Sequence, residues 1–327
     1  MTRLRSQCKK GDRILTVMIK ELRAGEHIKD LHALINHVTT GRTNGNNKST
    51  YLTITLQDTS GMIDAKLWSA KPEQIETLVT GCVVCCEGDI IKYGDELQMK
   101  LEKIVIVSKE ESEQVKYLKN APLSLEEMEA KLKSYLSQLQ SPSISLVTNA
   151  IFDEHFSNFL LYPAATRNHH EIVSGLAYHT TCMLDVANSI SLIYPSLNKD
   201  YLFAGILLHD LGKLFELSGP VVPEYTLQGK LLGHISIVSS LIKEKADELN
   251  VYDEDIIILQ HLVLSHHGKL EYGSPILPQI KEAEVIYLID NLDAKINMMD
   301  KALEQVEPGH YTKRIFPLDN RCLYRTK

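Results

Sequence analysis

Five histidines and two aspartates in the second half of the chain have the types and spacing of metal ligands. His209 and Asp210 follow an almost wholly apolar run at 203–208, which places them at the end of a buried helix. Burying an imidazole and a carboxylate is costly without a partner, and divalent transition metals bind both groups. His266 and His267 repeat this arrangement after a second apolar run. The candidate metal ligands are His179, His209, Asp210, His234, His266, His267 and Asp290.

A single histidine on an apolar helix face is usually a packed, hydrogen-bonded core residue. Taken alone, each of these histidines could therefore have a structural role instead. Seven potential ligands together favour metal binding, because they are enough to hold two ions.

Helices must position these ligands. Beyond a charged, structurally weak segment that begins at Lys109, the hydrophobic period changes from 2 to 3.6, and Pro or Gly marks the breaks. We expect an all-α domain at 126–327, preceded by a linker at 109–125. The predicted helices lie at 126–140, 143–160, 170–193, 200–213, 229–249, 254–267 and 281–306.

The first part of the chain, residues 13–108, predicts an all-β domain. Residues 51–56 and 62–68 alternate with period two around a turn, which indicates a hairpin. Two further strands are expected at 83–91 and 97–107, and the polar segment 39–48 is predicted to be an exposed loop. Several short strands in under 110 residues suggest a small barrel.

Aromatic rings and cations occur together in this barrel. Tyr51, Trp68 and Tyr93 lie near several lysines, including Lys66, and single-stranded nucleic acid binds to such mixtures through stacking and charge. A place in the barrel core is the alternative for Tyr51 and Trp68.

Length and composition set the wider frame. A chain of 327 residues with 44% hydrophobic and 24% charged residues is typical of a globular protein with two domains. Residues 1–108 hold 15 Lys+Arg and 13 Asp+Glu, a net charge of +2. Because the whole chain carries −7, residues 109–327 carry −9. We therefore expect any basic surface for nucleic acid in the first part of the chain. The apolar stretch at 14–19 is too short for a signal peptide or membrane span, so we expect a cytoplasmic protein without membrane contact.

A family resemblance sharpens these expectations. The ligand motifs are His-Asp-Leu-Gly-Lys at 209–213, His179 upstream, and Gly-His at 233–234, Ser-His-His-Gly at 265–268 and Ile-Asp-Asn-Leu-Asp at 289–293 downstream. They resemble the HD superfamily of phosphohydrolases. Residues 162–171, 174–179 and 291–295 also resemble the YhaM family of 3′-to-5′ exoribonucleases, which joins an OB-fold to an HD domain. The resemblance begins near residue 13, and the basic residues 1–12 are unmatched.

The resemblance implies two metal ions and a role for each ligand. His179, His209, Asp210 and Asp290 would hold one ion, with Asp210 bridging to a second ion held by His234, His266 and His267. Two such ions can lower the pKa of a water and clamp a phosphate for in-line attack. Histidine-rich ligation favours manganese, with iron and magnesium as alternatives.

The activity implied is hydrolysis of single-stranded RNA from its 3′ end to nucleoside 5′-monophosphates, with single-stranded DNA as a further substrate. Two alternatives stay open: a phosphohydrolase of small nucleotides, and a nucleic-acid-binding protein whose HD domain is structural. The leading helices at 126–160 offer surface for a homo-oligomer.

Four further residues are site candidates. Lys213 follows His209 by four residues, so on a continuing helix it would reach the same site and hold a phosphate oxygen; a solvated lysine at the helix end is the alternative. Asp290 and Asp293 are one helical turn apart, so their roles are exchangeable; we take Asp290 as the ligand. His169 and His170 stand in a family-like context that suggests substrate contact or proton transfer, with capping or packing as the alternative.

Overall fold

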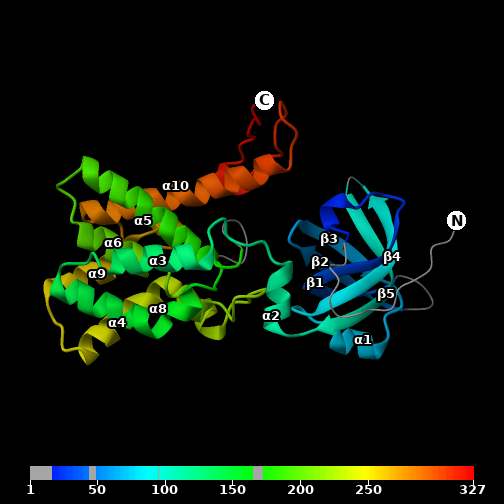
Figure 1. Ribbon diagram of the computed structural model, residues 1–327, viewed down its shortest axis with the longest axis horizontal. Helices are drawn as coiled ribbons and strands as arrows, with labels where there is room; N and C mark the ends of the chain where they lie inside the picture. The colour runs from blue at the N-terminus through cyan, green and yellow to red at the C-terminus, as the bar shows by residue number, and fades with distance from the viewer. Residues whose placement is uncertain (1–16, 44–48, 95, 165–171) are drawn as a thin grey trace. The chain divides into compact units, whose positions relative to one another are not determined.

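The chain divides into two compact units, Met1–Lys119 and Asn120–Lys327, in this computed structural model (Figure 1). The structure describes residues 17–43, 49–94, 96–164 and 172–327. Each unit has its own cluster of buried apolar side chains. Two independent cores of this kind agree with the two domains expected from the length of the chain.

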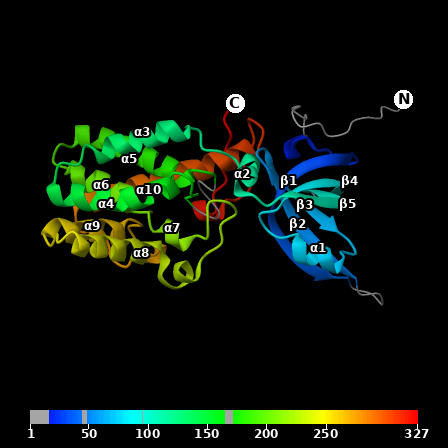
Figure 2. The ribbon, with the colours of Figure 1, turned by 60° about the horizontal axis from the view of Figure 1, so that its bottom comes forward.

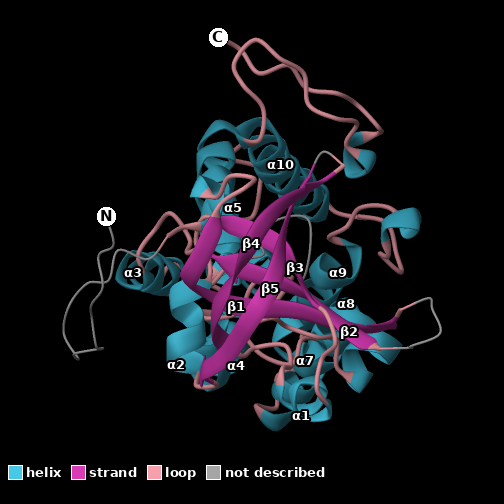
Figure 3. Cartoon of the chain, turned by 90° about the vertical axis from the view of Figure 1, so that its right-hand side faces the viewer, coloured by secondary structure: helices cyan, strands magenta, loops and turns pink. Residues whose placement is uncertain are grey.

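The first unit is a five-stranded closed barrel, which confirms the predicted small barrel (Figure 3). Its strands are β1 (His27–Arg42), β2 (Thr50–Asp58), β3 (Gly61–Leu67), β4 (Val83–Tyr93) and β5 (Glu96–Ser108), in the order β1-β2-β3-β5-β4. Strands β3 and β5 pair in parallel, and the other pairs, including the closing pair β1 and β4, are antiparallel. Short helices η1 (Ile19–Glu21) and α1 (Pro72–Thr77) complete this part of the unit.

The predicted hairpin is strands β2 and β3, and its alternation separates two faces. Leu52, Ile54 and Leu56 point into the barrel core, while the intervening threonines are half-buried. Strand β1 is the one that the sequence pattern did not reveal. Register shifts near Ile28 and Ile35 interrupt its period of two, because each bulge turns the following side chains to the other face.

The predicted loop 39–48 is wrong in its first part. Residues 39–42 belong to β1 and pair with residues 50–53 of β2, while residues 44–48 lie outside the described part of the chain. Thr39 and Thr40 favour a strand because they are β-branched, despite the polar and glycine-rich sequence that follows them.

The segment that we expected to be weakly structured, from Lys109 to 121, contains two helical turns. These are α2 (Glu111–Gln114) and η2 (Val115–Tyr117), and Leu118 behind them is buried. The first helix of the second unit begins at Leu125, after Ser124 accepts a hydrogen bond from Glu127 N. A linker at 109–125 therefore stays a prediction.

The second unit is helical, as predicted (Figure 2). Its helices are α3 (Leu125–Leu136), α4 (Pro142–Phe159), α5 (Gly175–Ile193), α6 (Lys199–Leu208), α7 (Lys213–Glu216), α8 (Leu227–Glu248), α9 (Glu254–Ser265) and α10 (Lys281–Glu304), with 3-10 turns η3 (Leu270–Tyr272) and η4 (Phe316–Leu318). Among the described residues, no helix combines the length and apolar character needed to cross a bilayer.

Helix α6 lies at the centre of this unit. Its residues 202–208 are all buried, and the helix packs against α5, α9 and α10. The single helix predicted at 200–213 is wrong, because α6 ends at Leu208 and α7 starts only at Lys213. Gly212 lies in this break, where a Cβ atom would come within 2.2 Å of the carbonyl oxygen of His234. Only glycine allows the backbone of α8 to approach so closely.

Candidate metal centre

The structure brings the seven predicted ligands together from five helices. His179 comes from α5, and His209 and Asp210 follow the end of α6. The other four are His234 in α8, His266 and His267 after α9, and Asp290 in α10. Two groups form, within each of which the ligand atoms lie within 4.8 Å of one another: His179, His209 and Asp210, and His234, His266 and His267.

The carboxylate of Asp210 lies between the two groups. Its Oδ2 is 3.3 Å from His209 Nε2 and 3.9 Å from His179 Nε2. Its Oδ1 is 3.5 Å from His234 Nε2 and 3.9 Å from His266 Nε2. One oxygen therefore faces each group, which is the arrangement that a carboxylate needs to bridge two ions.

Helix ends orient two of the imidazoles in the same way. His209 and His266 are the C-terminal caps of α6 and α9. Each Nδ1 donates to the carbonyl three residues earlier, at 2.7 Å to Ile206 and 2.6 Å to Val263. The last carbonyls of a helix lack helical partners, so these histidines satisfy them and direct Nε2 toward the centre.

All five histidine rings use Nδ1 for an oxygen partner. His267 Nδ1 donates to Tyr272 O at 2.8 Å, and the remaining two rings donate to carboxylates, His179 to Asp293 at 2.6 Å and His234 to Glu216 at 3.1 Å. With Nδ1 as the donor, each ring presents a lone pair on Nε2 whenever it is neutral. This is the form in which histidine binds a metal.

Three buried polar atoms at the centre have no hydrogen-bond partner among the described residues. They are Asp210 Oδ1, His234 Nε2 and His266 Nε2. Leaving such an atom unsatisfied costs about 1–3 kcal/mol. All three carry lone pairs that point toward the same region, so a divalent cation would satisfy them together. The donor set therefore fits a divalent metal.

The charges around the centre also suit a cation. Burial lowers the pKa of both His266 and His267, which keeps these imidazoles neutral. Burial disfavours the charged form of Asp210, but Lys213 and His209 outweigh that effect and hold its pKa well below the usual value. The carboxylate is therefore ionised in its buried position.

Lys213 is buried, with only 8% of its surface exposed, and its Nζ lies 2.6 Å from Asp210 Oδ2. This position does not fit the alternative of a solvated lysine. Lys213 is the first residue of α7 and does not lie on a helix that continues from His209. It therefore reaches the centre as predicted, but not through the helical spacing on which the prediction was based.

Asp290 and Asp293 lie at opposite edges of the His179 ring. Asp290 Oδ1 is 3.3 Å from Nε2, the edge that faces the centre, and Asp293 Oδ2 is 2.6 Å from Nδ1. Burial opposes protonation of His179, but the two carboxylates outweigh it and raise its pKa to about 10. A metal ion at the centre would have to displace this proton.

Glu216 was missed in the sequence. It is buried and contacts His234 through both the ring and the backbone amide. The signal that could have revealed it is its place between the apolar residues Leu214, Phe215 and Leu217, directly after the His209-Asp210 motif. His169 and His170 lie outside the described residues.

Two of the predicted aromatic residues of the barrel, the half-buried Tyr51 and the exposed Trp68, form a stacking patch with Lys66, while Tyr93 is exposed elsewhere on β4. The rings of Tyr51 and Trp68 are 5.0 Å apart, and Lys66 Nζ lies 5.4 Å and 5.5 Å from their centroids. Trp68 is 46% exposed, so it does not belong to the core. The Tyr51 ring lies over Gly41 of β1, where a Cβ atom would come within 2.3 Å of it. Glycine thus allows the ring to lie against the strand.

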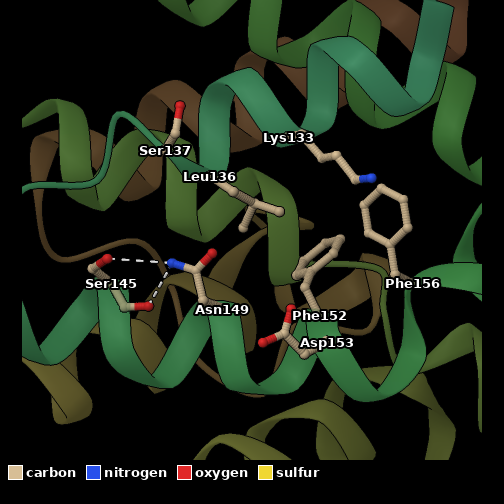
Figure 4. A pocket seen from close by; sticks show the side chains of 8 residues that line it. All are labelled: Lys133, Leu136, Ser137, Ser145, Asn149, Phe152, Asp153 and Phe156. Atoms are coloured by element: carbon tan, nitrogen blue, oxygen red, sulfur yellow. Dashed lines mark hydrogen bonds between the residues drawn. The ribbon is translucent and has the colours of Figure 1, made fainter. Parts of the chain in front are cut away.

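The helical unit also contains a pocket of about 420 Å³ between α3 and α4 (Figure 4). Lys133 extends over the ring of Phe156 at its edge, with Nζ 5.4 Å from the ring centroid. None of the predicted site residues lines this pocket.

Comparisons with known proteins agree with this architecture. A family model described as an HD domain matches residues 176–295, and one described as an OB-fold nucleic acid binding domain matches residues 33–107. The chain joins an OB-fold to an HD domain. The HD match spans every predicted metal ligand, and such domains are typically metal-dependent phosphohydrolases, so the protein has the features of a metal-dependent hydrolase or binder of nucleic acid.

Two solved structures resemble the OB-fold unit. A crystal structure of a domain of replication protein A from Methanococcus maripaludis is 21% identical, covers 29% of this chain and 98% of its own, and gives a TM-score of 0.25. A solution structure of the second OB-fold domain of replication protein A from the same organism is 17% identical with the same coverage and a TM-score of 0.26.

Metal binding should stabilise the protein measurably. An ion present at about 100 times its Kd stabilises the folded state by about 2.7 kcal/mol if it does not bind the unfolded chain. We therefore expect Mn²⁺ to raise the Tm in scanning calorimetry. His266→Ala should lose the part of this shift that the ion of its own group supplies, whereas His261→Ala, which removes a histidine of α9 outside the centre, should keep the whole shift. An equal shift in both variants would contradict metal binding at this centre.

Proposed function

We propose that this protein is a metal-dependent 3′-to-5′ exoribonuclease of the YhaM type that degrades single-stranded RNA to nucleoside 5′-monophosphates. Single-stranded DNA is a second candidate substrate. The observation that carries the proposal is the buried centre of five histidines and two aspartates, in which Asp210 Oδ1, His234 Nε2 and His266 Nε2 have no hydrogen-bond partner among the described residues. It stands in a chain that also contains an OB-fold with an aromatic pair, of which Trp68 is exposed.

In this proposal the centre holds two divalent ions. His179, His209, Asp210 and Asp290 would hold one, and His234, His266 and His267 would hold the other, with Asp210 shared between them. We favour manganese, because imidazole-rich sites bind it more readily than magnesium. The ions would supply Lewis acidity at the scissile phosphate and make water a stronger nucleophile.

Lys213 contributes a positive charge next to Asp210. Its ammonium group lies 2.6 Å from the Asp210 carboxylate. We propose that it holds a non-bridging phosphate oxygen when RNA is bound, which stabilises the charge that develops during attack. The ribose 3′ oxygen is then the leaving group, and the phosphate stays on the 5′ oxygen of the released nucleotide.

The barrel supports a polymeric substrate. Tyr51 and Trp68 offer stacking surfaces for bases, and Lys66 beside them can pair with the phosphate backbone. Small nucleotides need no such surface. The patch therefore favours RNA over a free nucleotide as the substrate.

A time course with 5′-labelled single-stranded RNA and Mn²⁺, run beside free nucleotides, tests the proposal. We expect a ladder of progressively shorter labelled products and release of unlabelled 5′-monophosphates. Cleavage of the nucleotides alone would instead identify a small-molecule phosphohydrolase. Binding without turnover would identify a nucleic-acid-binding protein with a structural HD domain.

A further inference from the structure

Two carboxylates contact imidazoles of the centre from behind. Glu216 Oε1 accepts from His234 Nδ1 at 3.1 Å, and Asp293 Oδ2 accepts from His179 Nδ1 at 2.6 Å. The other three rings donate Nδ1 to backbone carbonyls. His179 and His234 belong to different ligand groups. Each group therefore contains one ring that is held by a carboxylate.

A carboxylate partner strengthens an imidazole as a metal ligand more than a backbone carbonyl does. Both partners fix the tautomer and the orientation of the ring, but an anionic partner also makes the imidazole a more basic and stronger metal ligand. Loss of such a partner typically weakens metal binding by about 10- to 100-fold. A separate carboxylate in each group could thus set the affinity of each ion on its own.

The contact of Glu216 depends on a specific backbone arrangement. Gly233 has φ 72° and ψ 154°, which interrupts α8 directly before His234. The amide of His234 is therefore available to donate to Glu216 Oε1 at 3.1 Å, in addition to the ring. Gly229 lies against the same residue, since a Cβ atom there would come within 2.4 Å of Glu216 O. Two glycines thus place this carboxylate against both donors of His234.

Asp293 gains its position from the periodicity of α10. It lies three residues after Asp290, so both carboxylates reach the His179 ring, at 3.3 Å for Asp290 and 2.6 Å for Asp293. His179 is fully buried, and the Asp293 side chain is 20% exposed. The His179 ring is thereby held between Asp290, which faces the centre, and Asp293, which lies outside it.

We propose that Glu216 and Asp293 are positioning residues that each control the affinity of a different metal ion. Asp293 acts through His179 on the ion of the His179, His209 and Asp210 group. Glu216 acts through His234 on the ion of the His234, His266 and His267 group. This inference rests on the two-metal centre of the proposed function, but not on the identity of the substrate.

Manganese titration of the metal-free, full-length protein by isothermal calorimetry tests this assignment without any activity measurement. The wild-type protein should show two binding events. Glu216→Gln and Asp293→Asn should each weaken one event by about 10- to 100-fold and leave the other unchanged. The double variant should weaken both.

A second ligand variant identifies which ion each carboxylate controls. His267→Ala weakens binding of the ion held by the His234, His266 and His267 group. Adding Glu216→Gln to this variant should therefore change only that same binding event. Adding Asp293→Asn should instead weaken the event that His267→Ala left intact. Glu224→Gln and Asp300→Asn, which change exposed carboxylates on the loop after α7 and on α10, are the matched controls and should leave both events unchanged.

Three results would overturn the inference: a single binding event in the wild-type protein, equal weakening of both events by each single variant, or no weakening by either. Circular dichroism of the metal-free variants separates loss of an ion from loss of the fold. If RNA is not degraded but the two events respond as described, the exoribonuclease proposal fails and this assignment stands.

Discussion

Asp210→Ala should lower the rate of RNA hydrolysis by at least about 10³-fold, the loss expected when a group that organises charge in the transition state is removed. The physical reason is the position of its carboxylate, with one oxygen facing each group of histidines. Its removal also leaves Lys213 buried without its anionic partner. Initial rates with Mn²⁺ and single-stranded RNA measure the effect.

RNA binding by the Asp210→Ala variant should remain close to that of the wild-type protein, because the stacking patch lies on the barrel. Asp300→Ala, an exposed change on α10, is the control for rate and should have no effect. Hydrolysis that survives the loss of Asp210 would contradict the assignment of the centre. Loss of RNA affinity together with activity would mean that the centre is also the main binding surface.

Trp68→Ala and Tyr51→Ala should each weaken binding of single-stranded RNA by about 5- to 150-fold, which corresponds to the 1–3 kcal/mol typical of one stacked base. Their effects should not add, because the two rings contact each other at 5.0 Å. Fluorescence anisotropy with labelled RNA measures the Kd, in an Asp210→Ala background that prevents degradation.

Met62→Ala is the matched control for the stacking patch, since it removes an exposed apolar side chain near the other end of β3. It should leave the Kd unchanged. In otherwise wild-type protein, Trp68→Ala should raise the KM for long RNA while the cleavage rate of a dinucleotide stays the same. Equal Kd values for Trp68→Ala and Met62→Ala would show that RNA binds elsewhere.

The buried histidines and aspartates of the centre could be predicted to lie together because burial leaves a clear mark on the sequence. Charged or imidazole side chains at the ends of apolar runs, such as His209 and His266, have few stable alternatives to a metal or a dense hydrogen-bond network. The helix pattern was equally clear for long amphipathic segments. It failed at 209–212, where the chain turns between α6 and α7 and Gly212 packs against the backbone of His234, a contact that only the folded chain contains.

Other features were hidden because they depend on tertiary geometry. The bulges of β1 erase the period that marks a strand. The partners of the ring nitrogens are mostly backbone carbonyls, which carry no residue signature. Likewise, spacing placed Asp290 and Asp293 on one face of α10, but only the position of the His179 ring distinguishes the carboxylate facing the centre from the one behind the ring.

The most direct test of an activity that requires a free 3′ end compares two forms of one RNA. The protein and Mn²⁺ are incubated with a linear single-stranded RNA and with the same sequence closed into a circle, and the released nucleotides are identified by mass spectrometry. We predict that the linear RNA yields nucleoside 5′-monophosphates while the circle stays intact. Degradation of the circle at a comparable rate, or release of 3′-monophosphates from the linear form, would contradict the proposed function.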